Sequence, residues 1–309
     1  MRKKAVKDVL TLLEFSTEEL YSLIESAKKL KENRLKKDPK IFAGKTGVLI
    51  FEKPSLRTRI SFETAINELG GHAINLASEG VGMGKRESVE DVARNLERMV
   101  HLIIARTFSH NTIEKLAHYS SIPVVNALTD THHPCQALAF ALTMHERLNS
   151  RKGVKVVFIG DGNNVCHSLM LLSAKLGYDF TAVTPKGYEP EKEILSNCSD
   201  IARKGGSKIE LTNHINGAVR DATVIYTDVW TSMGQEKEEE KRKKDFAGFQ
   251  INNALLSRAP SQVMVSHCLP AHRGQEITSD VLDSGHSIAF DEAENRLHVQ
   301  KAIIVYLFS

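Results

Sequence analysis

Two kinds of segment alternate along the chain: stretches whose apolar residues recur every three or four positions, and short continuous apolar runs. The first spacing is typical of amphipathic helices and the second of buried strands. The run STEE at residues 16–19 has the form of a capping box and predicts a helix that extends to about residue 30. The run from Thr46 to Phe51 predicts the first clear strand. The same patterns predict further strands at residues 72–76, 101–105 and 123–126, and helices directly after residues 55–59 and at 88–99, 111–118 and 134–148.

A polar break at residues 149–153 separates this half from a second one. The near-continuous apolar run 154–159 is typical of a central parallel strand that helices cover on both faces. Further strands are predicted at residues 180–183, 208–211, 224–227 and 263–267, with helical segments between them. We therefore predict an α/β protein with two doubly wound parallel-sheet domains, whose ligands collect at the carboxyl ends of the strands. The expected domains are residues 1–149, with a C-terminal helix at about 291–309 that packs back on them, and residues 150–290.

Composition narrows the classes of partner. The 309 residues carry a formal net charge of +3, and no basic stripe with interleaved aromatic residues indicates a nucleic-acid partner. No window approaches the roughly 20 apolar residues of a membrane span, and the basic N-terminus lacks a cleavage site, so a soluble, cytoplasmic protein without membrane partners is expected. The four cysteines form no CxxC pair, which argues against a zinc ribbon or a disulfide framework and favours reduced thiols. The Glu- and Lys-rich run at residues 236–245 is interpreted as a solvated helix face.

The run SLRTR at residues 55–59 lies where an apolar strand gives way to a helix. Unpaired backbone N–H groups at a helix start, the positive end of the helix dipole and forked arginine donors all favour a phosphate-like dianion. A solvated basic helix start is the simpler interpretation when this segment is taken alone.

Other candidate residues lie at predicted strand ends and helix starts. The run HPCQ at residues 133–136 places an imidazole just before a helix and an amide one turn inside it, although a lone histidine is usually a structural cap. Arg106 ends a strand, and Arg296 lies among acidic residues, where a surface salt bridge is the simpler explanation. The run HCLP at residues 267–270 leaves a thiol and carbonyl groups at a strand end, where a cysteine is more often a small buried apolar side chain.

The turn GDGNNV at residues 160–165 follows a strand and precedes a helix, as in a dinucleotide-binding fingerprint. Valine replaces the third glycine, and residues 184–187, after the next strand, supply no acidic side chain for a ribose. The two asparagines are therefore interpreted as partners for the carboxylate or amine of a small polar substrate, with a simple turn as the alternative.

Taken together, these segments resemble the transcarbamoylase family from end to end. SLRTR is similar to the family's Ser-x-Arg-Thr-Arg motif for carbamoyl phosphate, HPCQ to its His-Pro-x-Gln motif, and Arg106 to its second phosphate-binding arginine. GDGNNVCHS, HCLP and the run DVWTSMGQE at residues 228–236 resemble the ornithine branch of the family rather than the aspartate branch.

The resemblance implies that the neutral δ-amine of ornithine attacks carbamoyl phosphate, giving citrulline and phosphate without a metal or organic cofactor, with arginine biosynthesis as the expected pathway. It implies catalytic roles for Arg106, His133, Cys268 and Arg296. Carbamoyl phosphate is expected to contact Ser55, Leu56, Arg57, Thr58, Arg106, His133, Gln136, Cys268, Leu269 and Arg296. Ornithine is expected to contact Asn164, Asp228, Ser232 and Met233. No dedicated general base is identified: Asp228 and Cys268 are expected to favour the neutral amine, and phosphate to take the proton.

Two positions depart from the family pattern. Leu56 replaces a residue with a hydroxyl group in many relatives, although its backbone N–H remains available. In the loop at residues 79–85, relatives often carry a glutamine that reaches into a neighbouring subunit's site, whereas this chain has Gly82, and Lys85 or Arg86 could take that role. A homotrimer is expected because family sites lie beside a subunit interface.

Three alternatives are open at this point. The chain could carbamoylate another amine, such as putrescine or an N-acylated ornithine, although Asp228 and residues 232–234 favour a free amino-acid head group. It could be a non-catalytic binding relative that keeps the fold. It could also be a nucleotide-binding oxidoreductase, for which the glycine run is the only support.

Overall fold

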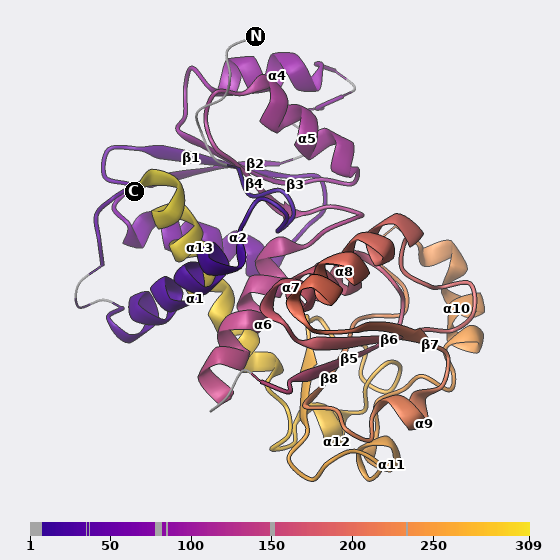
Figure 1. Cartoon of the computed structure of the whole chain (residues 1–309). Coiled ribbons are helices and arrows are strands. Elements are labelled where there is room, and N and C mark those ends of the chain that lie inside the picture. Colours follow the sequence, from indigo (N-terminus) through magenta and orange to yellow (C-terminus); the bar gives the residue numbers. More distant parts are fainter. Residues whose placement is uncertain are drawn as a thin grey trace. The chain divides into compact units, whose positions relative to one another are not determined.

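The structure of the protein is a computed structural model that describes residues 8–34, 36, 38–77, 82–84, 86–148, 152–232 and 234–309. The chain forms two compact units: unit 1 runs up to Leu142 and includes Glu294–Ser309, and unit 2 is Thr143–Ala293. Each unit contains one parallel sheet flanked by helices (Figure 1). The predicted α/β class with two parallel sheets is therefore confirmed. Within the predicted break, residues 149–151 lie outside the described part of the chain.

The sheet of unit 1 has four parallel strands in the order β2-β1-β3-β4. Its strands are β1 (Thr46–Phe51), β2 (His72–Ala77), β3 (Leu102–Arg106) and β4 (Val124–Leu128). The helices that lie wholly or partly in unit 1 are α1 (Thr17–Glu32), α2 (Leu56–Glu68), α4 (Val89–Leu96), α5 (His110–Tyr119), α6 (Pro134–Arg147) and α13 (Ala289–Phe308). The chain adds β2 on one side of β1 and then β3 on the other, so the strand order reverses between β1 and β3. Ligands of open parallel sheets bind at the carboxyl ends of the strands that flank such a switch point.

Local sequence signals account for the elements of unit 1. Ser16 begins α1 with the predicted capping box, because its side chain accepts from the Glu19 N–H and the Glu19 carboxylate accepts from the Ser16 N–H. The central strand β1 is apolar on both faces and fully buried from Val48 to Ile50. Side chains of β1 and β3 form a buried cluster with α4 and α5.

The C-terminal helix packs on unit 1, as predicted. The Tyr306 ring lies 5.2 Å from the Phe15 ring, and its hydroxyl donates to Glu19 at 2.9 Å. Lys301 is fully buried and pairs with Asp38 and with Glu68. In Figure 1 this helix, drawn in yellow, lies beside α1.

The sheet of unit 2 has five parallel strands in the order β7-β6-β5-β8-β9. They are β5 (Lys155–Ile159), β6 (Asp179–Val183), β7 (Ile209–Thr212), β8 (Val224–Thr227) and β9 (Met264–His267). The helical segments are α7 (Asn164–Leu176), α8 (Lys192–Gly205), α9 (Ile215–Ala218), η1 (Glu236–Glu238), α10 (Glu239–Asp245), α11 (Asn253–Leu256) and α12 (Ser279–Leu282). Here the strand order reverses between β5 and β8. The second switch point therefore lies between the GDGNN turn that follows β5 and the segment that follows β8.

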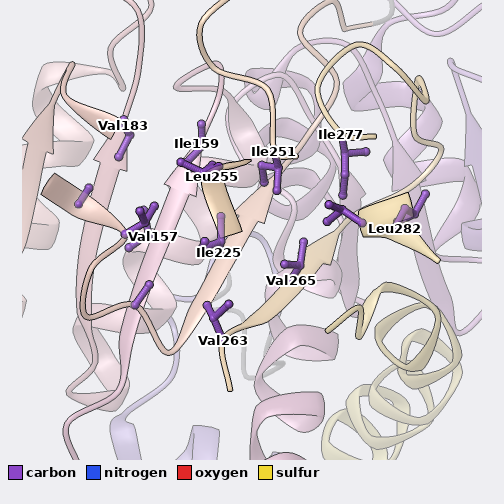
Figure 2. Close-up of a cluster of buried hydrophobic side chains, with 14 of the residues drawn as sticks. Val157, Ile159, Val183, Ile225, Ile251, Leu255, Val263, Val265, Ile277 and Leu282 are labelled. Carbon is purple, nitrogen blue, oxygen red and sulfur yellow. The ribbon is translucent and has the colours of Figure 1, made fainter. Parts of the chain in front are cut away.

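One face of this sheet is covered by an apolar cluster (Figure 2). Alternate strand residues, including Val157, Ile225 and Val265, point to this face and pack against α11 and α12. The residues between them, such as Tyr226 and Ser266, point to the other face. This alternation decides which side chains stand together at the carboxyl edge.

The described residues include all four cysteines, and none of them is joined to another by a disulfide bond. In the part of the chain that the structure describes, no helix combines the length and the apolar character that crossing a membrane requires.

Candidate functional site

The turn after β1 builds a cationic helix start in unit 1. Ser55 is the N-cap of α2, and its side-chain oxygen accepts from the Thr58 N–H at 3.4 Å. Thr58 is only 1% exposed, whereas Leu56 is 69% exposed. The first N–H groups of a helix have no partner within the helix, and together with the helix dipole they make a helix start such as that of α2 suited to an anion. The first turn of α2 contains no acidic residue that would compete with an anion for this helix start.

Pairing of the strands brings Arg106 to the same edge. Phe51, the last residue of β1, is in register with Arg106 at the end of β3. The Glu52 N–H donates to the Arg106 carbonyl at 2.8 Å, so the turn begins directly beside this arginine. The predicted phosphate residues Arg57 and Arg106 thus lie on the two sides of the switch point.

His133 is buried among cationic groups. It is 5% exposed and directly precedes α6. Burial, followed by the positive charges of Arg296, Arg106 and Arg57, holds the pKa of His133 well below its usual range. The imidazole is therefore neutral at neutral pH and keeps one N–H to donate. A neutral donor among guanidinium groups suits an oxygen on which negative charge develops.

Arg296 differs from the sequence-based expectation. A surface salt bridge was the simpler interpretation, and it is wrong, because Arg296 is 2% exposed. Its guanidinium donates to Gln136 Oε1 at 2.7 Å and to Thr58 Oγ1 at 2.9 Å. α13 thus brings a third arginine to the residues of the SLRTR and HPCQ motifs, all within unit 1.

Cys135, the third residue of HPCQ, is not a reactive group of this site. Cys135 is fully buried, and burial raises the pKa of its thiol to about 11. A thiol in that state is not a nucleophile at neutral pH.

In unit 2, the switch point joins an asparagine to Asp228. Asn163 is the N-cap of α7, where its side-chain oxygen accepts from the N–H groups of Val165 and Cys166. Its amide nitrogen donates to Asp228 Oδ2 at 2.8 Å. Sequence reasoning chose the neighbouring Asn164, which is the first residue of α7. The N-cap position of Asn163 before the helix was the signal that could have identified it.

Cys268 meets the other oxygen of the same carboxylate. Its thiol donates to Asp228 Oδ1 at 2.6 Å, and it is half-buried rather than an enclosed core residue. The neighbouring Leu269 has φ of +53°, and its N–H donates to His267 Nδ1 at 2.8 Å. The predicted pair Asp228 and Cys268 is therefore brought together at the carboxyl ends of β8 and β9.

Asp228, His267 and Cys268 place their ligand atoms within 4.8 Å of one another. His267 Nδ1 already accepts from Leu269, and its Nε2 pairs with the buried Glu276 at 2.9 Å. With both ring nitrogens engaged, this set does not offer a metal ion an imidazole ligand without rearrangement.

The segment after β8 is held by an arginine that sequence reasoning missed. Arg242 donates to Asp161 Oδ2 at 2.8 Å and to the Trp230 carbonyl at 2.9 Å. Arg242 is buried, so the prediction that the run 236–245 is a solvated helix face is wrong for this residue. The Ser232 N–H donates to Gln235 Oε1 at 3.0 Å, and Met233 lies outside the described residues.

Two family descriptions match consecutive parts of the chain. Residues 7–146 match the carbamoyl-P binding domain of aspartate/ornithine carbamoyltransferase, and residues 152–307 match its Asp/Orn binding domain. The chain belongs to the aspartate/ornithine carbamoyltransferase family. The two matches together extend over nearly all of the sequence, so the likeness predicted from the motifs is confirmed.

Individual members of the aspartate/ornithine carbamoyltransferase family resemble this chain closely. A Bacillus cereus protein named ornithine carbamoyltransferase is 50% identical over 306 residues, covering 99% of this chain and 96% of that protein. A Pyrococcus furiosus protein named as the anabolic ornithine carbamoyltransferase is 48% identical over 301 residues, covering 97% of this chain and 96% of its own length. The solved structure of ornithine carbamoyltransferase from Pyrococcus furiosus has a TM-score of 0.95 and 46% identity, covering 100% of this chain and 99% of that one.

Proposed function

We propose that this protein transfers the carbamoyl group of carbamoyl phosphate to the δ-amine of L-ornithine, giving L-citrulline and phosphate in arginine biosynthesis. The observation that carries the proposal is the cluster in unit 1, where the positive charges of Arg57, Arg106 and Arg296 all act on a buried, neutral His133. Such a cluster suits a dianionic leaving group and a carbonyl that becomes an oxyanion. The anabolic direction is supported by the name of the Pyrococcus furiosus relative.

Different residues of unit 1 bind different groups of carbamoyl phosphate. Ser55, Arg57, Thr58, Arg106 and the N–H of Leu56 bind the phosphate in this proposal. Thr58, Arg106 and His133 polarise the carbonyl, while Gln136 orients the carbamoyl amide, together with the Leu269 carbonyl. The hydrogen bonds from Arg296 to Thr58 and Gln136 support a role for Arg296 over the carbamoyl group.

The residues of unit 2 bind the amine substrate. Asp228 binds the α-ammonium group, and Asn164, Ser232 and the backbone at Met233 bind the α-carboxylate and amino group. Cys268 lies near the side-chain amine in this proposal, and its hydrogen bond to Asp228 supports placing the two residues at one substrate. The proposed domain boundaries follow: residues 1–149 with about 291–309 for carbamoyl phosphate, and 150–290 for ornithine.

The reaction then proceeds by charge stabilisation and alignment. The δ-nitrogen lone pair attacks the carbonyl carbon, and the tetrahedral intermediate places its oxyanion at Thr58, Arg106 and His133. The bond from carbon to the phosphate oxygen breaks, and phosphate leaves with the electron pair and takes the amine proton. An amine with the ordinary pKa of about 10.4 is mostly protonated at pH 7, so binding must favour its neutral form.

Arg57→Ala tests the proposal against a matched control, Arg59→Ala. Arg59 lies two positions away in the same helix turn, but its side chain is 59% exposed and pairs with Glu63. We expect Arg57→Ala to lower kcat/KM for carbamoyl phosphate by about a hundredfold or more, and Arg59→Ala to change it by less than threefold. If both variants turned over carbamoyl phosphate like the wild type, the anion site would be wrong.

A citrulline assay with ornithine, putrescine and N-acetylornithine side by side tests the acceptor. Ornithine should be turned over fastest, and faster turnover of putrescine would overturn the acceptor assignment. Cys268→Ser should change the rate or its pH profile. If it left both unchanged, Cys268 would have no role in amine binding.

We further propose a cytoplasmic homotrimer. The resemblance to the family supports the trimer, and Leu56 and Ile60, one turn apart on α2, are exposed apolar side chains suited to an interface. Of the two residues that could take the role of the relatives' glutamine in a neighbouring subunit's site, Lys85 lies outside the described residues and Arg86 is exposed. Light scattering should give three times the 34.4 kDa chain mass. A monomer at working concentration would contradict it.

A further inference from the structure

Glu292, in the first turn of α13, is a fully buried carboxylate in unit 2 that none of the roles above uses. Each of its two oxygens accepts a hydrogen bond from a hydroxyl group. Tyr226 Oη donates to Oε1 at 2.6 Å, and Ser266 Oγ donates to Oε2 at 2.5 Å. Both contacts are at the short end of the usual range for O–H···O hydrogen bonds, so the carboxyl group holds the two donors closely.

Each of the two donors lies two residues before a member of the proposed amine-binding pair, Asp228 and Cys268. Tyr226 on β8 and Ser266 on β9 are partners in the ladder, which ends at the next pair, Thr227 and His267. Because strand side chains alternate, Tyr226 is on the same face as Asp228, and Ser266 on the same face as Cys268.

The ends of β8 and β9 therefore carry two cross-connections. One is the bridge from Tyr226 through Glu292 to Ser266, and the other is the hydrogen bond between Cys268 and Asp228. Asp228 and Cys268 each lie one residue beyond the last backbone pair, so no pair of the ladder holds them directly. The apolar cluster of Figure 2 covers the opposite face and includes none of these residues.

We propose that Glu292 is a positioning residue for the amine substrate: by holding Tyr226 and Ser266 on one carboxylate, it fixes β8 and β9 at the spacing at which Asp228 and Cys268 meet. This inference rests on the proposed function, because it assigns that pair to ornithine. Loss of the bridge separates the pair and weakens alignment of the amine, while the carbamoyl-phosphate residues of unit 1 keep their own contacts.

Steady-state kinetics of Glu292→Ala, Ser266→Ala and the double variant test this. We expect the KM for ornithine to rise at least fivefold in each, and the KM for carbamoyl phosphate to rise by a clearly smaller factor. Because both single variants break the same bridge, Ser266→Ala should add less than twofold in the Glu292→Ala background. Val157→Ala is the control for lost stability, since Val157 is fully buried in the same sheet but faces the other side. It should lower Tm without changing the KM for ornithine.

Alkylation of Cys268 by iodoacetamide gives a readout that does not depend on turnover. Cys268 is the one cysteine of the chain that is not fully enclosed, and peptide mass spectrometry identifies its adduct. With its hydrogen bond to Asp228 lost, the thiol should react at least threefold faster in Glu292→Ala and Ser266→Ala, but not in Val157→Ala.

Unchanged alkylation together with an unchanged KM for ornithine would overturn the inference and leave Glu292 a structural residue. If Glu292→Ala does not fold, Ser266→Ala decides the question alone, because it removes a single oxygen atom. A wild-type protein that makes no citrulline would refute the proposed function, while the alkylation rates would still decide whether Glu292 positions Cys268.

Discussion

Replacing Arg242 by methionine removes one partner of a buried ion pair and keeps most of the apolar stem. The guanidinium bonds Asp161 at 2.8 Å and the Trp230 carbonyl at 2.9 Å, and the two charged side chains are 7% and 12% exposed. It also lies 5.0 Å from the centre of the Tyr188 ring. The substitution therefore leaves a carboxylate and a carbonyl in unit 2 without this donor.

The size of the effect follows from burial. Removing one partner of a buried ion pair costs about 3–5 kcal/mol, because an uncompensated charge remains. Burial already raises the pKa of Asp161, while Arg242 opposes that rise. Without Arg242 the pKa rises further, and uptake of a proton by Asp161 limits the cost to the lower end. The second ion pair of Arg242, with the exposed Glu238, adds little.

We therefore expect a loss of about 3 kcal/mol in the free energy of unfolding at pH 7, which is about 6–12 °C in Tm for a domain of this size. Urea unfolding followed by circular dichroism measures the first quantity. The double variant Asp161→Asn with Arg242→Met should recover at least half of the loss. In the single variant, the raised pKa of Asp161 makes the penalty smaller as the pH falls and larger as it rises.

Lys241→Met is the matched control, because the side chain of Lys241 is 70% exposed and pairs with Asp245 on the surface. It should change stability by less than about 1 kcal/mol. An equally small loss in Arg242→Met, or an equal loss in its double variant, would show that the buried pair does not hold the segment after β8.

Three further predictions concern other positions. Because the pKa of His133 is held below 6.5, the stability that it contributes is present above that pH and lost as the pH falls below it, so urea midpoints of His133→Asn should depend less on pH from 6.5 down to about 5. Gly162→Ala should lower stability by about 1–3 kcal/mol in urea unfolding, since its Cβ would lie 2.3 Å from Pro190 N, and a loss below that range would show that the loop yields. Lys301→Met should lower Tm strongly, because Asp38 and Glu68 lose the buried cation that they share, and an unchanged Tm would contradict a stabilising role.

Most of the fold was predictable because its signals are local. The capping box at Ser16 and the apolar run of β1 are read within a few residues, and both elements lie close to their predicted bounds. The candidate residues of the SLRTR turn and Cys268 could be chosen for the same reason, since a strand end or a helix start is a feature of neighbouring residues. The position of Asp228 at a strand end likewise indicated its place at the sheet edge.

The partners of distant residues were not predictable in this way. Acidic neighbours of Arg296 along the chain suggested a surface ion pair, whereas its actual partners, Thr58 and Gln136, lie far away in sequence. Arg242 lies in a charged run that resembles a solvated face, and only its contact with Asp161 shows that it is buried.

By itself, the sequence determined the elements, the two parallel sheets and the kinds of side chain at their carboxyl edges, because periodicity, caps and turns depend on residues close together in the chain. Only the tertiary structure decided which of those side chains meet. It joined Cys268 to Asp228 and Glu292 to Tyr226 and Ser266, because burial and hydrogen bonding depend on strand order and register, which bring together residues from distant parts of the chain.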